Sequence, residues 1–140
     1  MSTPVSKPTE TILIVDDERE VLSVAADALG RLGYAVLSTE DPGAALRLAR
    51  TSPEHVHLLM TDVVMPLMNG RELAVEFRAI RPEVKVLFMS AYSIESVEDY
   101  RIRLAPGEPF LAKPFTMTEL ATQVRAALAY RPPSAWPRVK

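Results

Sequence analysis

The 140-residue chain contains no cysteine, which excludes disulfide bonds and thiolate metal sites and fits a reducing compartment. It has no run of the roughly 18 apolar residues that span a membrane. Its first residues, MSTPVSKPTE, lack the apolar stretch of a signal peptide. The net charge is only −2, so no broad basic surface favours nucleic acid or an anionic membrane. A cytoplasmic protein without a membrane partner is the simplest expectation.

The composition is that of an ordinary globular protein, with 48% hydrophobic and 24% charged residues. A chain of this length is expected to form one domain with a sizeable core. The polar segment 1–9 carries two prolines and is expected to be a flexible arm. The segment 131–140, RPPSAWPRVK, carries three prolines and is expected to be a tail outside the core. The folded domain is therefore expected at 10–130.

Short aliphatic runs alternate with helical patterns along this domain. The runs lie at 12–15, 35–37, 58–60, 84–89 and 110–112. Because they are nearly continuous rather than alternating with polar residues, they predict a parallel sheet that is covered on both faces. Five strands, each followed by a helix, predict a doubly wound α/β fold.

Several residues mark where these helices begin. The fourth helix is expected within SIESVEDYRIRLA, at 93–105. The starts of the second, third and fifth helices are indicated by capping residues and first-turn residues: Asp41-Pro42, Asn69-Gly70, and Thr116 with Glu119.

Polar side chains follow four of the five aliphatic runs. The first run ends in Asp16-Asp17, the third continues to Asp62, the fourth to Ser90 and the fifth to Lys113. In open parallel sheets the ligand site lies beyond the carboxyl ends of the strands, so these residues are expected to converge there.

The residue types in this group predict phosphate chemistry. Two carboxylates about 4 Å apart repel by roughly 4 kcal/mol at an effective dielectric of ~20. A hard cation such as Mg²⁺ would offset that repulsion. One carboxylate can then act as a nucleophile towards phosphorus. Lys113 would pair with phosphoryl oxygens, and Ser90 would hydrogen-bond to one of them.

The motifs IVDDE, TDVVMPLMNG, FMSAY and KPF resemble the receiver domains of bacterial two-component response regulators. The stretches TDVVMP and LFMSAYS are similar to receivers of hybrid histidine kinases. The resemblance implies a CheY-like, flavodoxin-like fold with strand order 2-1-3-4-5 and five flanking helices. It implies a phospho-accepting signalling switch in a two-component phosphorelay.

The resemblance also implies roles for individual residues. Asp62 matches the phospho-accepting aspartate. Asp16 and Asp17 match the acidic pair that binds Mg²⁺ together with Asp62, and Mn²⁺ is able to take the place of Mg²⁺. The backbone carbonyl of Val64 matches the position that completes the metal site.

Further residues match the phosphate-binding and switch positions. Ser90 matches the switch hydroxyl and Phe110 the switch aromatic, and the backbone N–H of Ala91 is expected to face the phosphate. Lys113 matches the phosphate-binding lysine, and the Lys113-Pro114 bond is expected to be cis.

Val64 and Tyr92 flank the phosphorylation site at positions where polar residues can help to place a hydrolytic water. An aliphatic and an aromatic side chain should hinder that water. The sequence therefore predicts slow self-dephosphorylation.

No glycine-rich nucleotide loop is present, so the phosphoryl group is expected from histidine phosphate on a sensor kinase or phosphotransfer protein. The chain would catalyse only its own phosphorylation and dephosphorylation. Phosphorylation would change the partner preference of the face built by helix four, strand five and helix five, the 4-5-5 face. That face could also form a homodimer. No helix-turn-helix follows Tyr130, so the output is expected through an unidentified protein rather than direct DNA binding.

Two alternative functions remain open. The first is a Mg²⁺-dependent aspartate-nucleophile phosphatase of the haloacid-dehalogenase type. It calls for Asp-x-Asp after the first strand, whereas Glu18 stands two residues after Asp16, and it calls for a cap that no insertion supplies. The second is a pseudo-receiver, an interaction module that is not phosphorylated, against which the complete acidic set argues.

Other conspicuous side chains are expected to be structural. His55 and His57 precede the third strand, at the end of the sheet opposite the acids. The methionines at 60, 65, 68 and 89 are expected in the core or loops. Arg47, Arg50, Arg78 and Arg81 are expected on solvated helix exteriors. The sequence assigns no role to Trp136.

Overall fold

The computed structural model describes residues 10–91 and 104–131. Its elements follow in the order β1 (Thr11–Val15), α1 (Arg19–Arg31), β2 (Ala35–Thr39), α2 (Pro42–Thr51), β3 (Leu58–Asp62), α3 (Gly70–Ile80), β4 (Lys85–Ser90), β5 (Leu111–Ala112) and α5 (Met117–Ala129). The arm at 1–9, Tyr92, most of the expected fourth helix, Trp136 and nearly all of the tail lie outside the described residues.

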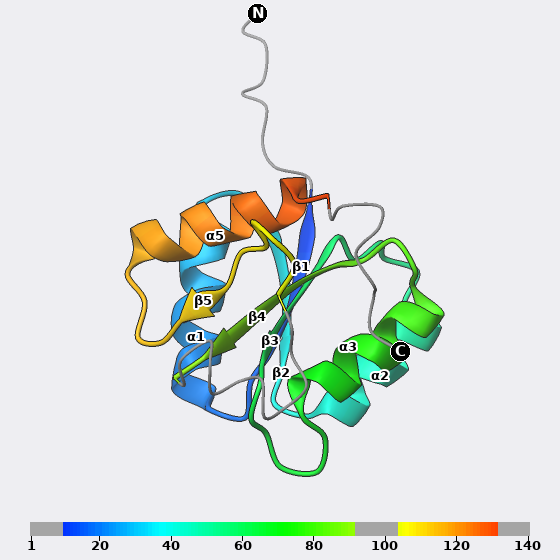
Figure 1. Ribbon diagram of the computed structural model, residues 1–140. Coiled ribbons are helices and arrows are strands. Elements are labelled where there is room, and N and C mark those ends of the chain that lie inside the picture. The colour runs from blue at the N-terminus through cyan, green and yellow to red at the C-terminus, as the bar shows by residue number, and fades with distance from the viewer. Residues whose placement is uncertain (1–9, 92–103, 132–140) are drawn as a thin grey trace, which may run out of the picture.

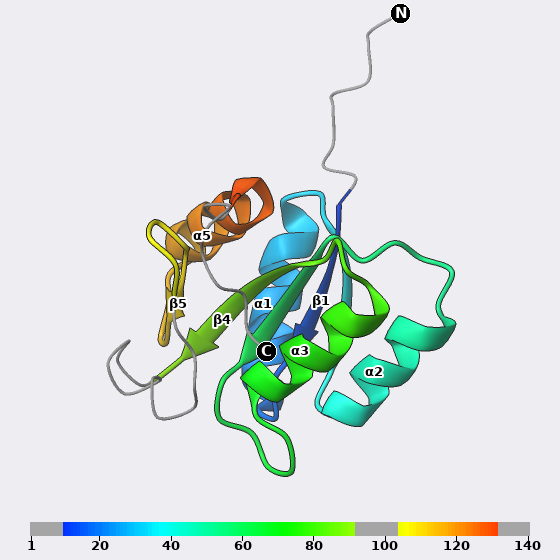
Figure 2. The same cartoon turned by 45° about the vertical axis from the view of Figure 1, so that its right-hand side comes forward.

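The five strands form one parallel sheet in the order β2-β1-β3-β4-β5. Helices α1 and α5 cover one face of the sheet, and α2 and α3 cover the other (Figures 1 and 2). The prediction of a doubly wound α/β fold is therefore confirmed. The described residues contain four helices rather than five, because the segment 92–103 between β4 and β5 is not among them.

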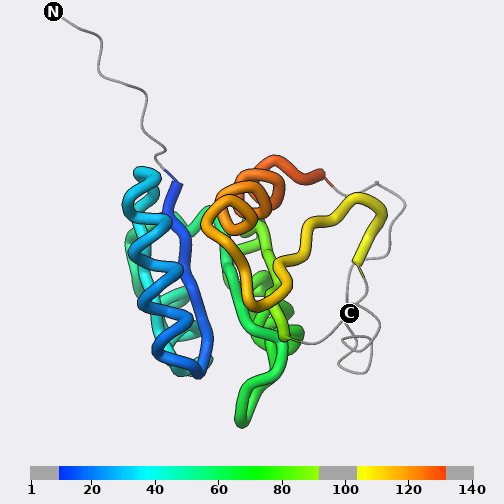
Figure 3. The backbone as a smooth tube through the Cα atoms, turned by 90° about the vertical axis from the view of Figure 1, so that its left-hand side faces the viewer, coloured from blue at the N-terminus to red at the C-terminus, as the bar shows by residue number. Residues whose placement is uncertain are grey.

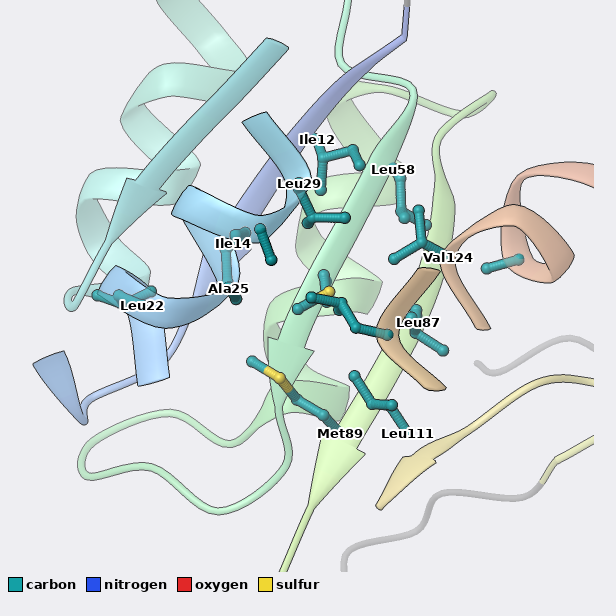
Figure 4. Packing of buried hydrophobic residues seen from close by; sticks show 14 residues of the cluster. Ile12, Ile14, Leu22, Ala25, Leu29, Leu58, Leu87, Met89, Leu111 and Val124 are labelled. Carbon is teal, nitrogen blue, oxygen red and sulfur yellow. The ribbon is translucent and has the colours of Figure 1, made fainter. Parts of the chain in front are cut away.

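Successive residues of β1 explain why its sequence is apolar throughout. Ile12 and Ile14 point to the α1 and α5 side, whereas Leu13 and Val15 point to the α2 and α3 side. All four are fully buried. Figure 4 shows the first side, where residues of α1 and α5 meet the central strands. Each such side chain stabilises the fold by roughly 1.5–3 kcal/mol, and an alternating strand would have left one face polar.

The predicted helix starts are confirmed. At α3, the Asn69 side chain accepts from the Glu72 backbone N–H and the Glu72 side chain from the Asn69 N–H, both at 2.9 Å. Thr116 and Glu119 make the same reciprocal pair at α5. Asp41 caps α2. None of the described helices has both the length and the hydropathy needed to cross a bilayer.

The end of the sheet where the strands begin is here called the amino edge. One side chain there, Arg81, does not lie where the sequence predicted. Arg81 was expected to point into solvent. Its guanidinium instead donates to three backbone carbonyls, those of Ala49 at 2.9 Å, Ser52 at 2.7 Å and Glu54 at 2.7 Å. Arg81 ends α3, and through these bonds it fixes the carboxyl end of α2 and the loop that leads into β3. The prediction was wrong because the carbonyls that it meets are about 30 residues away in sequence.

His57 and Lys85 also bind backbone groups at the amino edge. The Thr11 N–H donates to Nδ1 of His57 at 3.0 Å, which confirms the structural interpretation of this histidine. The Lys85 ammonium donates to the Tyr130 carbonyl at 2.6 Å, just past the end of α5. Both contacts join segments that are more than 40 residues apart.

Candidate functional site

The opposite end of the sheet, here called the carboxyl edge, gathers the predicted polar residues. Asp16 follows β1, Asp62 ends β3 and Lys113 follows β5. The Lys113 Nζ lies 2.7 Å from Asp16 Oδ2 and 3.3 Å from Asp62 Oδ1. Both aspartates are buried. The strand order places β1 beside β3, so two acids from separate segments face one lysine.

Asp17 completes an acidic cluster with Asp16 and Asp62. One carboxylate oxygen from each lies within 4.8 Å of the others. The Asp16 Oδ2 atom is buried, and its contact with Lys113 is an ion pair without the alignment of a hydrogen bond. A buried oxygen of this kind has capacity for another ligand. Three hard oxygen donors in this arrangement fit Mg²⁺ or Mn²⁺.

Burial and like charge make the cluster unfavourable when it is fully ionised. Burial, and next the charge of Asp16, raise the pKa of Asp62 from 3.8 to about 6, against the opposing effect of Lys113. Burial also raises the pKa of Asp16, again opposed by Lys113. Burial alone would lower the pKa of Lys113, but its contacts with Asp16 and Asp62 outweigh burial and raise it. The lysine therefore stays charged.

Oxygens of the two buried aspartates differ in their partners. Asp62 Oδ1 accepts from the Val63 N–H at 3.0 Å and also faces Lys113. Asp62 Oδ2 accepts no hydrogen bond from the described residues. Asp16 Oδ1 accepts from the Glu18 N–H at 2.9 Å, which folds the chain back after β1. The carboxylates are thus held by the loops that follow their own strands.

The predicted switch residues lie around the same edge. Ser90 ends β4 and is buried, its carbonyl accepts from the Lys113 N–H at 2.9 Å, and Ala91 follows it at the surface. Phe110 is half-buried and packs with Val64 against Val63, directly behind Asp62. The Lys113-Pro114 bond is cis, as expected.

Gly70 was predicted to open a helix, but its role beside Asp62 was missed. A Cβ atom at Gly70 would lie 2.3 Å from the Asp62 carbonyl oxygen. The Gly70 N–H donates to the Val63 carbonyl at 2.8 Å. The loop between β3 and α3 extends beyond the sheet at the end where α1 begins (Figure 3). Its return to the sheet requires a residue without a side chain, and glycine at the first position of a helix was the available signal.

The sequence made Glu18 an argument against the phosphatase motif only, and its contact with Lys113 was not predicted. Its Oε1 lies 3.3 Å from Lys113 Nζ, although its side chain is 65% exposed. A glutamate that follows two aspartates does not indicate from the sequence which positively charged side chain it will contact.

A parallel sheet ordered β2-β1-β3-β4-β5, with acids after β1 and β3 and a lysine after β5, defines a flavodoxin-like domain with an acidic site at its carboxyl edge. The sequence model of one protein family, the response regulator receiver domain, matches residues 12–125 of this chain. The chain belongs to this family. It is a receiver domain of two-component signalling, a phosphorylation-based switch of the kind that works with histidine kinases or phosphotransfer proteins.

Two curated relatives contain this domain within longer chains. The DNA-binding transcriptional regulator NtrC of Azospirillum brasilense is 34% identical over 128 residues, which are 91% of this chain and 26% of that protein. The sensor kinase CckA of Brucella abortus is 36% identical over 121 residues, which are 84% of this chain and 12% of that protein. This chain thus spans about a quarter of the length of NtrC and about an eighth of the length of CckA.

A solved structure agrees with the likeness to a hybrid kinase. The crystal structure of the receiver domain from the hybrid histidine kinase CckA has a TM-score of 0.69 and 35% identity, and the alignment covers 84% of this chain and 98% of that one. The predicted family resemblance is confirmed.

Proposed function

We propose that Asp62 is the phosphoacceptor of this receiver domain and takes its phosphoryl group from a histidine phosphate on a partner protein. The observation that carries the proposal is the placement of the Asp62 carboxylate beside two further acids and 3.3 Å from a buried ammonium. In this transfer an Asp62 oxygen forms the new O–P bond, the N–P bond to the histidine breaks, and the imidazole leaves with the electron pair.

The contacts of Asp62 favour one oxygen as the nucleophile. Oδ1 accepts from the Val63 N–H and forms the ion pair with Lys113, whereas Oδ2 accepts no hydrogen bond from the described residues. Oδ2 is the oxygen with the less restrained lone pairs, so we assign the attack to it. The raised pKa of Asp62 also makes its carboxylate a stronger nucleophile than an exposed aspartate.

Asp16, Asp17 and Asp62, with the backbone carbonyl of Val64, would hold Mg²⁺. When bound, the cation neutralises the acids and the charge that develops on the phosphoryl oxygens. Lys113 adds a fixed positive charge on the side of β5, because its ammonium is already positioned by Asp16 and Asp62.

The switch would follow from the added charge of the phosphoryl group, roughly −1.5 to −2. The Ser90 hydroxyl and the Ala91 N–H would donate to it, and Phe110 would turn inward behind Ser90. Phe110 is half-buried and packs against Val63, the residue that follows Asp62, and this contact supports the proposed coupling. The 4-5-5 face would then select a downstream protein or a second copy of the chain.

The acceptor role is tested with acetyl phosphate, a small donor that needs no cognate kinase. Wild type and Asp62→Asn are incubated with the donor and Mg²⁺, and intact mass is measured. We expect the gain of one phosphoryl group in wild type and none in the variant. An equal gain in both proteins would assign the acceptor elsewhere.

The same experiment separates the alternatives. A pseudo-receiver would gain no phosphoryl group in wild type. An aspartate-nucleophile phosphatase would turn over small phosphate esters, whereas we propose that this chain processes only its own phosphoryl group. Decay of the phosphorylated protein tests the predicted effect of Val64 and Tyr92. Loss within seconds would contradict slow self-dephosphorylation.

A further inference from the structure

Three carboxylates surround the Lys113 ammonium, and one of them lies outside the buried acid pair. Nζ lies 2.7 Å from Asp16, 3.3 Å from Asp62 and 3.3 Å from Glu18. All three contacts are ion pairs, and the contact with Glu18 also has the geometry of a hydrogen bond. Asp16 and Asp62 are buried, whereas the Glu18 side chain is 65% exposed. Glu18 is therefore the partner that solvent can most easily replace.

The backbone explains how Glu18 reaches the lysine. Glu18 is the N-cap residue of α1, with φ −95° and ψ 111°, and its side chain makes no capping hydrogen bond. Short residues such as serine and aspartate are preferred at this position because they reach back to the first helical N–H groups. The longer glutamate leaves those groups and extends across the carboxyl edge to Lys113. Its own N–H donates to Asp16 Oδ1 at 2.9 Å, which fixes the backbone of Glu18 beside the buried Asp16.

A phosphoryl group on Asp62 needs the donors that these carboxylates occupy. It also brings two or three anionic oxygens into the same space. We propose that Glu18 is a positioning residue that holds Lys113 in the unphosphorylated state and competes with the phosphoryl group for its ammonium. This inference rests on the proposed function of Asp62 and adds a restraint to it.

The magnitude of the restraint follows from its exposure. An exposed ion pair contributes only weakly to stability, and the glutamate also repels the incoming anion. Removing the charge should therefore tighten binding of a phosphoryl mimic by about 2- to 5-fold. The effect should be confined to Glu18, because the acids further along α1 do not contact Lys113.

Beryllofluoride in the presence of saturating Mg²⁺ is the probe, and its bound form is measured by ¹⁹F NMR in titrations of the full chain. Wild type is compared with Glu18→Gln and with Glu20→Gln. Glu20 lies in the first turn of α1, is exposed and makes no contact with Lys113, so its substitution removes the same charge without the contact. The Mg²⁺ affinity of each protein is measured first to ensure saturation.

We expect Glu18→Gln to bind beryllofluoride about 2- to 5-fold more tightly than wild type, with Glu20→Gln close to wild type. Equal tightening in both variants would assign the effect to net charge and overturn the proposal. Unchanged or weaker binding by Glu18→Gln would overturn it as well. If wild type binds no beryllofluoride, the proposed function of Asp62 fails first and the restraint fails with it.

Glu18→Asp separates contact from charge in a second way. Aspartate keeps the negative charge, but it is one methylene shorter and is a favoured N-cap, so it should turn to the helix and release Lys113. We expect its beryllofluoride affinity to exceed that of wild type, and the ¹⁵N resonance of the Lys113 ammonium in the metal-free protein to shift as in Glu18→Gln. An affinity and a resonance that both match wild type would show that the contact with Lys113 has no role.

Discussion

The two ends of the β-sheet use polar side chains in opposite ways. At the amino edge, polar side chains bind backbone groups of segments that are distant in sequence. Arg81 and Lys85 donate to carbonyl oxygens, and His57 accepts from an N–H. At the carboxyl edge, side chains meet other side chains, and acids of like charge are buried beside each other around Lys113.

This difference separates stability from function. A buried donor or acceptor is costly when it lacks a partner, and the amino edge removes that cost. The carboxyl edge creates a cost, because burial raises the pKa values of Asp16 and Asp62. Perturbed pKa values of this kind cluster at functional sites, and here they lie at the proposed site for a cation and a phosphoryl group. Removing a buried charge at the carboxyl edge should therefore stabilise the protein, whereas removing a side chain that binds the backbone at the amino edge should destabilise it.

The largest effect is expected at Gly70, where the carboxyl edge has a steric requirement. Gly70→Ala would place a Cβ atom 2.3 Å from the Asp62 carbonyl oxygen, and the backbone must move to relieve the clash. We expect a loss of about 3 kcal/mol in the free energy of unfolding, measured by urea denaturation, together with weaker beryllofluoride binding.

Gly30→Ala is the matched control for this substitution. Gly30 lies within α1, and a Cβ atom there would meet nothing within 4 Å. Alanine should stabilise that helix by about 0.5–1 kcal/mol. If Gly70→Ala unfolds at the same urea concentration as wild type, the close approach to Asp62 is not a constraint.

Asp62→Asn should stabilise the metal-free protein, although it removes the proposed phosphoacceptor. The folded pKa of about 6 lies above the value of 3.8, so the folded state binds the proton more tightly than the unfolded state. Wild type should therefore lose stability as pH rises from about 4 to about 7. At pH 7 we expect the variant to be more stable by about 2–3 kcal/mol.

The comparison is made by urea denaturation in a chelator and again with Mg²⁺. Saturating Mg²⁺ should stabilise wild type more than Asp62→Asn, because the acid cluster is the proposed Mg²⁺ site. A variant that is less stable than wild type at pH 7 without metal would show that Asp62 is not strained.

Arg81→Ala should have the opposite sign at the amino edge. It removes three bonds to backbone carbonyls that hold the end of α2, and we expect a loss of about 2 kcal/mol in the free energy of unfolding. Arg50→Ala is the control, since Arg50 is an exposed arginine in the last turn of α2 and should change stability by less than about 0.5 kcal/mol. Beryllofluoride affinity should not change in either variant, and a large change would show that the two edges are coupled.

The same comparison explains how far the sequence predicted the molecule. The strands and the convergence of Asp16, Asp62 and Lys113 followed from apolar runs and from the rule that parallel strands end at one edge. Both signals are local or topological. The contacts of Arg81 and Glu18 were not predicted, because their partners belong to segments that are distant in sequence and come close only in the folded chain. The helical pattern of the sequence around an arginine is the same whether its side chain is exposed to solvent or binds three carbonyls.

Gly70 lies between these cases. Its helix start was predicted from Asn69-Gly70, but the distance to the Asp62 carbonyl depends on the path of the loop between β3 and α3. The fourth helix expected at 93–105 and the effect of Tyr92 remain predictions, since most of that segment and Tyr92 lie outside the described residues.

The smallest effect is expected from His57, where the pH dependence should have the sign opposite to that of Asp62. Burial, and next the neighbouring His55, lower the pKa of His57 from 6.5, against the opposing charge of Glu10. Protonation would also place a hydrogen on Nδ1, which accepts from the Thr11 N–H. Stability from this group should therefore be complete above pH 6.5 and fall as the pH drops below that value.

His57→Asn tests this sign, because the asparagine oxygen can occupy the place of Nδ1 and does not titrate. The free energy of unfolding is measured between pH 5 and pH 7 in the Asp62→Asn background, which removes the larger opposing dependence. We expect the fall in stability at low pH to disappear in the double variant. His55→Asn keeps the Thr11 bond and should retain most of that fall. An identical pH dependence with and without His57 would show that the bond tolerates protonation, and the amino edge would then contain no titrating contact of this kind among the described residues.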